Sequence, residues 1–134
     1  MVGRTTIVDR DTIQVMFKRV ADEESAIGQG IAQVEDAIGS LRGRKCYGAF
    51  ENGEYRACVQ VRDGDDAAAI GLEAGELPGG RYARVRLKGE PPHLYELIGP
   101  TFEQLSQRPD HDHARPGIEF YKRHDVIDLL LPIV

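Results

Sequence analysis

The sequence predicts an α+β fold made of two βαββ units, with antiparallel sheet, two helices packed on one side and a cleft between the repeated units. The first observation is hydrophobic periodicity, which changes from two to about 3.6 and back to two in each half of the chain. The second observation is the order strand, helix, strand, strand, which occurs in both halves. We expect a single domain, with one unit over residues 11–62, the other over 80–134 and a linker between them.

Composition indicates an ordinary globular chain. It has 134 residues, 41% of them hydrophobic and 29% charged, and a net charge of −5. The acidic balance argues against direct nucleic-acid binding, and the longest apolar run is far shorter than the roughly 20 residues of a membrane span. The first residues contain no apolar signal segment, and two cysteines cannot build a disulfide framework. A cytoplasmic location is therefore expected.

The first unit begins after a short polar segment, residues 1–10, which we expect to be a frayed lead-in. Alternation predicts a strand over 11–20, and a four-three-four-three spacing then predicts a helix of about five turns. Ser25 or Asp22 is suited to cap this helix, and Gly43 is suited to end it. The helical face consists of Ile27, Ile31, Val34, Ile38 and Leu41.

A β-hairpin should follow, because Asn52-Gly53 separates two β-rich runs, 45–50 and 54–62. A two-residue turn would place Tyr47 and Cys58 on one face. A three-residue turn would instead set Cys46 opposite Cys58 and allow a disulfide. We favour the first arrangement, with two free thiols.

The second unit repeats the pattern. A linker over 64–79, with a linking strand at 67–76, leads to a strand over 80–88. The next segment, 91–107, is expected to be a helix with a kink at Pro100, because proline cannot donate a backbone hydrogen bond. Strands at 117–123 and 126–134 complete the unit.

The candidate site lies on the strand that contains Glu119 and Tyr121. Alternation puts Ile118 and Phe120 on one face, which we expect to pack on the helices, so that Glu119 and Tyr121 face away from them. If that face is open, both side chains are simply solvated. If it lines the cleft, a carboxylate beside an aromatic ring would attract a flat or apolar cation or act as a proton acceptor.

Other groups of polar residues give weaker signals. Residues 110–113 contain two histidines and two aspartates, but no further ligand has a suitable spacing, so we expect a polar loop and no metal. The glycines at 79–80 lack the spacing of a phosphate loop and precede a strand. No catalytic triad has supporting context, and no cofactor is expected.

Four segments resemble GyrI-like, AraC-type effector-binding domains, which have a SOUL-like fold. Leu77–Ala83 resembles the family's "lPaGrYa" segment, and Lys88-Gly89 followed by Pro91 resembles its "hkGp" motif. Pro116–Tyr121 resembles the "p…E.Y" strand, and Asp128–Ile133 resembles the "iPv" end. The resemblance covers most of the chain and is strongest from 77 to 134.

This resemblance implies a duplicated βαββ fold in which a cleft glutamate meets ligands, often lipophilic cations. That glutamate corresponds to Glu119 and its neighbouring tyrosine to Tyr121, with Tyr82, Tyr47 and Phe17 as weaker candidates for the walls. The family includes multidrug-binding proteins and bacterial transcription regulators. Two features depart from its pattern: Pro100 in the second helix and a histidine-rich loop over 107–116, both of which could reshape the cleft rim. No helix-turn-helix segment precedes the first strand, so we do not expect a complete one-component regulator.

Three functions are open at this point. The preferred one is a stand-alone small-molecule-binding protein, with Glu119 supplying the charge and aromatic side chains the contact area. The second is a cofactor-free hydrolase of strained, cyclopropane-bearing genotoxins, in which Glu119 orients or deprotonates water and Tyr121 or Tyr82 donates a hydrogen bond. The third is a gyrase-modulating interaction module. A protein partner or a homodimer is left open.

Overall fold

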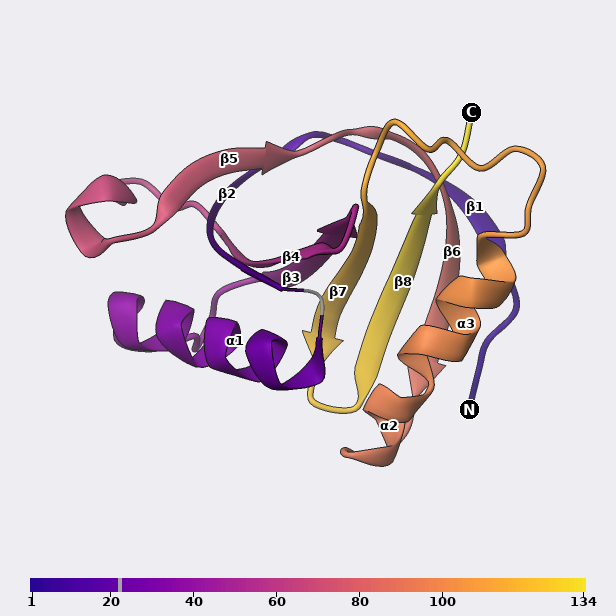
Figure 1. Cartoon of the computed structure of the whole chain (residues 1–134), viewed down its shortest axis with the longest axis horizontal. Helices are drawn as coiled ribbons and strands as arrows, with labels where there is room; N and C mark the ends of the chain where they lie inside the picture. Colours follow the sequence, from indigo (N-terminus) through magenta and orange to yellow (C-terminus); the bar gives the residue numbers. More distant parts are fainter. Residues whose placement is uncertain (22) are drawn as a thin grey trace.

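The computed structural model describes residues 1–21 and 23–134. Within these residues, antiparallel strands form one curled sheet, and the helices lie on one side of it (Figure 1). The strand order across the sheet is β1-β6-β8-β7-β3-β4-β2-β5. The strands are β1 (Thr6–Arg10), β2 (Ile13–Ala21), β3 (Cys46–Glu51), β4 (Glu54–Gln60), β5 (Glu73–Leu77), β6 (Gly80–Lys88), β7 (Gly117–Arg123) and β8 (Val126–Pro132). The helices are α1 (Glu24–Ile38), the 3₁₀ turn η1 (Ala68–Ile70), α2 (His93–Glu96) and α3 (Ile98–Leu105). None of the helices in the described residues is long and apolar enough to cross a bilayer.

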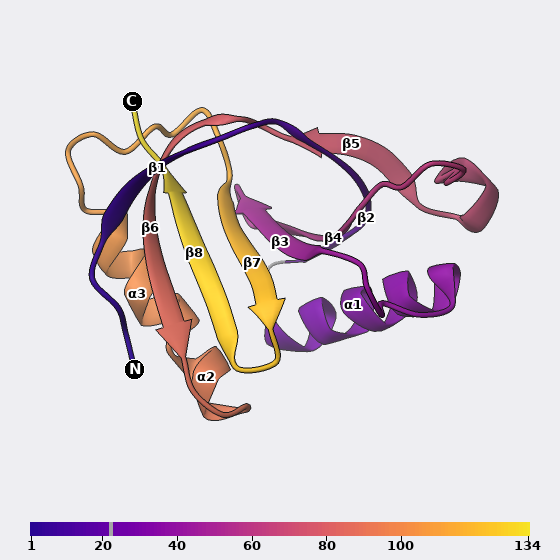
Figure 2. The same cartoon turned by 180° about the vertical axis from the view of Figure 1, so that it is seen from behind.

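The duplicated βαββ arrangement predicted from the sequence is confirmed. Strands β2, β3 and β4 with α1 form one unit, and β6, β7 and β8 with α2 and α3 form the other. The two units meet in the middle of the sheet, where β3 pairs with β7. Figure 2 shows the same sheet from behind, with the two groups of strands on either side of that pair. The exact limits 11–62 and 80–134 stay a prediction.

The expectation of a frayed lead-in over residues 1–10 is wrong, because this segment contains β1. Thr6–Arg10 pairs along its whole length with the start of β6, and Val8 packs against the core. Strand β5, which lies in the predicted linker, pairs with β2. The strand that precedes each unit therefore pairs with the first strand of the other unit, a long-range exchange that local periodicity does not show.

The predicted helices differ from the observed ones mainly at their ends. Helix α1 ends at Ile38, before the predicted Gly43, because Gly39 adopts a positive φ of 85° and donates its N–H to the carbonyl of Glu35. The suggested cap Asp22 falls outside the described residues, as does the side chain of Ser25. The predicted kink is confirmed, since the second helix divides into α2 and α3 just before Pro100.

The hairpin turn has the predicted two residues. Asn52 and Gly53 have φ angles of 54° and 76°, both positive, as the tight turn between antiparallel strands requires. Tyr47 consequently lies opposite Cys58, and both cysteines are free thiols. The preference for two unpaired cysteines is confirmed.

The core is divided between the two faces of the sheet. On the helix side, one cluster packs under α2 and α3 and another packs under α1. On the opposite side, a third cluster is formed by side chains from the strands alone, because the curled sheet packs this face against itself. Ile118 belongs to that third cluster and Phe120 packs against it. The expectation that these two residues face the helices is therefore wrong, and Glu119 and Tyr121 face the helix side instead.

Candidate functional site

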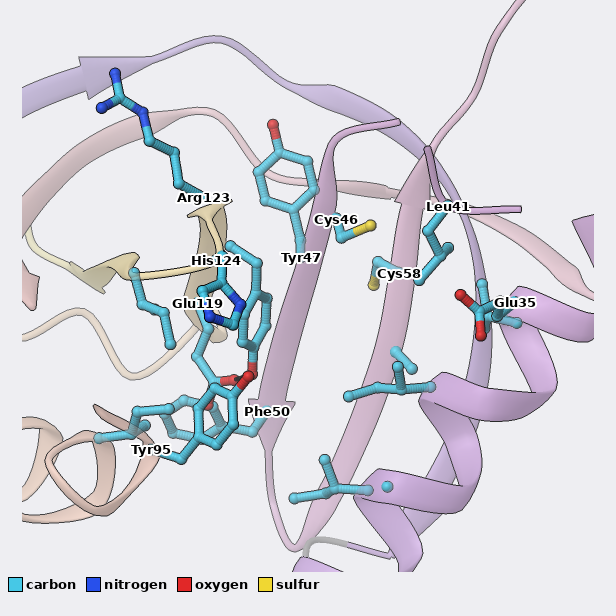
Figure 3. Close-up of a pocket in the computed structure, with 18 of the residues that line it drawn as sticks. Glu35, Leu41, Cys46, Tyr47, Phe50, Cys58, Tyr95, Glu119, Arg123 and His124 are labelled. Carbon is cyan, nitrogen blue, oxygen red and sulfur yellow. Dashed lines mark hydrogen bonds between the residues drawn. The ribbon is translucent and has the colours of Figure 1, made fainter. Parts of the chain in front are cut away.

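A pocket of about 1600 Å³ opens on the helix side of the sheet, between α1 and the α2–α3 segment (Figure 3). Helix α1 packs on β2 and β4, and α3 packs on β8. The helices leave β3 and β7 between them, and these two strands supply much of the pocket floor. The pocket thus follows from the duplication, because each helix covers the sheet of its own unit.

Glu119 is the acidic residue at the floor of this pocket, and only 7% of its surface is exposed. Its Oε1 atom accepts a hydrogen bond of 3.0 Å from the hydroxyl of Tyr55 and one of 2.5 Å from the hydroxyl of Tyr121. The two hydroxyl oxygens are 3.4 Å apart. Two phenols from different strands therefore hold one carboxylate in place.

The tyrosines remain hydrogen-bond donors at any ordinary pH. Burial raises the pKa of Tyr55 far above its usual value, and the nearby Glu119 carboxylate raises it further. The pKa of Tyr121 is raised for the same two reasons, in the same order. Both phenols consequently keep their protons and direct them at the carboxylate.

Gly48 makes room for this arrangement. It lies opposite Glu119 on β7 and opposite Ala57 on β4. A Cβ atom at this position would lie 1.9 Å from the Tyr55 hydroxyl oxygen and 2.8 Å from Oε1 of Glu119. A residue without a side chain is needed for Tyr55 to reach the carboxylate.

The walls around the carboxylate are apolar and aromatic. Phe50 packs against both helix-side clusters, and its ring meets that of Phe102 edge-on, with centroids 4.7 Å apart. Ile27 and Ile31 line the pocket from α1. Tyr95, which is 50% exposed, lies on the opposite wall (Figure 3). The pocket combines one buried carboxylate with a large apolar surface.

The structure brings Glu119 and Tyr121 together, as the shared face predicts, but it separates them from two other predicted wall residues. Tyr82 is fully buried on the opposite side of the sheet, where its hydroxyl donates to the carbonyl of Pro78. Phe17 belongs to the same opposite cluster. Neither residue lines this pocket.

Tyr47 has an intermediate position. Tyr47 borders the pocket, but its ring lies in the core of the opposite face, where it stacks on Phe120 with the ring centroids 4.9 Å apart. The sequence reasoning missed Tyr55 and Gly48 as parts of the site. Alternation along the hairpin does put Tyr55 on the face away from Tyr47, but only the pairing of β3 with β7 brings it to Glu119.

The histidine-rich loop lies apart from the pocket. None of residues 107–116 lines it. The ring centroids of His111 and His113 are 4.0 Å apart, and the backbone of His111 forms an isolated antiparallel β-bridge with Ile133 near the C-terminus. Within the described part of the chain, no group of three or more histidine, cysteine, aspartate or glutamate side chains is placed to hold a metal ion.

Comparison of the sequence with models of protein families finds no match, and comparison with curated proteins finds none either. The fold, in contrast, is similar to several solved structures. An integron cassette protein of Vibrio cholerae, VCH_CASS2, has a TM-score of 0.77 at 15% identity, over 99% of each chain. SAV2435 bound to tetraphenylphosphonium has a TM-score of 0.69 at 15% identity, over 98% of this chain and 94% of that one. The C-terminal domain of EcmrR has a TM-score of 0.65 at 15% identity, over 100% and 99%.

At these identities the likeness shows a shared fold alone. That fold is an α+β fold with a curled antiparallel sheet and helices on one side of it. In this chain, α1 and the α2–α3 segment leave the pocket between them. It is consistent with the GyrI-like effector-binding resemblance of the sequence.

Proposed function

We propose that this chain is a small-molecule-binding protein of the GyrI-like effector-binding type, which holds a lipophilic aromatic cation in the pocket between its helices. One observation carries the proposal. Glu119 is buried at the floor of an apolar pocket and is held by two hydroxyl donors, Tyr55 and Tyr121. In this proposal, Tyr121 has the role that the sequence predicts for it, and Tyr55 takes the role proposed for Tyr82.

The physical argument concerns the cost of removing charge from water. An ion in an apolar pocket is strongly disfavoured unless an opposite charge lies close to it. Glu119 would supply that charge, while the rings of Phe50, Phe102 and Tyr95 would cover the hydrophobic body of the ligand and contact its cation. The volume also exceeds the roughly 300–1000 Å³ common for drug-sized ligands, which suits a bulky guest.

Two similar structures support the proposal. SAV2435 was solved with tetraphenylphosphonium, a cation whose charge is surrounded by four phenyl rings. The EcmrR structure is a C-terminal domain, so this fold also occurs as part of a longer protein. Recognition of the ligand-bound form by a protein partner would be a further function beyond ligand binding.

Isothermal titration with tetraphenylphosphonium tests the proposal. We expect Glu119→Gln to weaken binding by about tenfold or more, which corresponds to about 1.4 kcal/mol, because the substitution removes the charge and nearly preserves the shape. Tyr121→Phe should have a smaller effect, since the carboxylate stays. Glu103→Gln, an exposed change outside the pocket, is the control. Equal affinity of Glu119→Gln and the wild type would reject Glu119 as the counter-charge.

The same geometry supports a second candidate function, addition of water to a strained ring. Glu119 would accept a proton from a water molecule while the water oxygen bonds to a ring carbon. The strained C–C bond at that carbon would break, and its electron pair would pass to the electron-withdrawing group of the substrate, which then takes up the proton from Glu119. The Tyr121 hydroxyl, which donates to Glu119 in this structure, would turn to donate a hydrogen bond to that group. Incubation with a cyclopropane-bearing electrophile, followed by mass spectrometry, tests this activity. Hydration no faster than in buffer would exclude this role for such compounds.

A further inference from the structure

The α1 wall of the pocket carries a second carboxylate, Glu35. Ile27, Ile31 and Glu35 are spaced four residues apart, so they form one row along the helix, and all three line the pocket. Figure 3 shows the carboxylate of Glu35 on the side of α1 that faces β3 and β4. A charged residue thus continues a row that otherwise consists of apolar residues.

Glu35 is close to the pocket floor at Cys46. Burial raises the pKa of the Cys46 thiol, and the negative charge of Glu35 raises it further, while Arg44 acts in the opposite direction. Cys46 lies directly opposite Tyr121 across the β3–β7 pair. Glu35 therefore acts at the same floor that carries the Glu119 site.

The two carboxylates nevertheless belong to different ends of the pocket. Cys46 is two residues along β3 from Gly48, the partner of Glu119. Two residues of strand and one strand spacing place Cys46 roughly 8 Å from the backbone of Glu119. In Figure 3, Glu35 lies on the far side of Cys46 from Glu119. A single compact cation on Glu119 would not also contact Glu35.

The charged residues that this wall contributes to the pocket, Glu23 and Glu35, are both acidic. Helix α1 contains no lysine or arginine, and Glu23, which precedes it, also lines the pocket. Among the described residues, Glu35 forms no ion pair or side-chain hydrogen bond. Arg42, which is exposed, borders the pocket beyond the end of α1, so an anionic ligand group is the competing possibility.

We propose that the pocket accepts elongated dications, with an aromatic onium group at Glu119 and a second cationic group at Glu35. The inference rests on the proposed function and adds a second subsite to it. The apolar row of Ile27 and Ile31 would cover the chain that joins the two charges.

The test uses three alkyl-triphenylphosphonium probes with the same linker. The chain ends in trimethylammonium, in its neutral isostere tert-butyl, or in a carboxylate. By isothermal titration, we expect the trimethylammonium probe to bind the wild type about fivefold more tightly than the tert-butyl probe, as one partly screened ion pair would allow. Glu35→Gln should abolish this difference and leave the affinity for the tert-butyl probe unchanged. Glu119→Gln should weaken both probes.

Asp36→Asn is the matched control, because it removes a carboxylate from the next position of α1, where the side chain is exposed and does not line the pocket. It should preserve the preference for trimethylammonium. The inference is overturned, with the proposed function intact, if the tert-butyl probe binds and the trimethylammonium group gives no gain. It is also overturned if the gain survives in Glu35→Gln, or if the carboxylate probe binds best. Failure of all three probes and of tetraphenylphosphonium to bind would overturn the proposed function as well.

Discussion

Gly48 is the residue on which the geometry of the carboxylate depends most directly. Glycine is required because an added methyl group would overlap the Tyr55 hydroxyl and press on Glu119. The substitution Gly48→Ala should therefore displace both side chains, lower the free energy of unfolding by about 1–3 kcal/mol and weaken tetraphenylphosphonium binding. Chemical denaturation and calorimetric titration measure the two effects.

Gly28→Ala provides the comparison for that experiment. A Cβ atom at Gly28 meets nothing within 4 Å, so alanine should stabilise α1 by about 1 kcal/mol. If Gly48→Ala proved as stable as the wild type and bound the cation equally well, the close packing of Tyr55 on Glu119 would not exist in solution.

Cys58 makes the free energy of unfolding depend on pH in the alkaline range. Burial raises the pKa of its thiol from the ordinary 9.0 to about 12, with only partial compensation from Arg56. As the pH rises past 9, the unfolded chain loses this proton and the folded chain keeps it, so the folded state loses stability. Between pH 8 and 10 we expect Cys58 to contribute a loss of about 1 kcal/mol.

Denaturation of the wild type and of Cys58→Ala at several pH values measures this contribution. The alanine variant should be less stable at pH 8, because a buried sulfur is missing, but its stability should fall less steeply with pH. Parallel profiles for the two proteins would contradict the raised pKa of the thiol.

Residue-level reasoning from the sequence reached Glu119 and Tyr121 but assigned them to the wrong face. Alternation shows which side chains share a face, and it does not show on which face the helices lie. Ile118 and Phe120 are apolar because the curled sheet buries its own inner face. Burial against other strands and burial against a helix both require apolar residues, so the sequence pattern is the same in the two cases. The role of Glu119 in ligand binding stays a prediction.

At the scale of elements, the side chain of Arg115 links the histidine-rich loop to the sheet through hydrogen bonds. Arg115 donates to the backbone carbonyls of Gly79, Arg81 and Ile133 and to the carboxylate of Asp112. Its guanidinium also lies over the ring of Tyr82, 4.9 Å from the centroid. The sequence leaves open that this loop reshapes the cleft rim. In the structure the loop does not line the pocket, and its contacts join β6 to the end of β8.

Arg115→Ala should therefore lower the free energy of unfolding by about 2 kcal/mol, because partly buried carbonyls lose their donor. Cation binding should change little, since the loop does not line the pocket. Arg108→Ala is the matched control, because within the described residues the Arg108 side chain pairs with nearby Asp110, and the substitution should cost less than about 1 kcal/mol. Urea denaturation gives both values, and equal losses in the two variants would contradict a special role for Arg115.

Most elements were predictable from periodicity and turn residues. The hairpin turn, the kink at Pro100 and strands β6 and β7 fall where the sequence places them. Helix ends were less well predicted, because Leu41 continues the apolar spacing after the helix has ended at Ile38 and still packs on the cluster under α1. The spacing of apolar residues indicates which side chains are buried, and a loop residue that follows a helix can be buried on the same face as the helix.

At the scale of the whole molecule, the exchange of edge strands joins the two units. Strand β1 completes the sheet beside β6, and β5 completes it beside β2. Deleting residues 1–10 should expose the backbone of β6 and the core beneath Val8, with a clearly lower urea midpoint. A truncated chain with an unchanged midpoint would show that β1 adds nothing to the stability of the sheet.

The sequence by itself determined the α+β class, the repeated order of elements, the two-residue hairpin turn and the pairing of an acid with a tyrosine on one strand. These features depend on neighbours along the chain, where side-chain period and turn chemistry act. Only the tertiary structure decided which face holds the pocket, that Tyr55 and Gly48 belong to the site, and that β1 pairs with β6. Each of these depends on the register between distant strands and on the curl of the sheet, which no local pattern specifies.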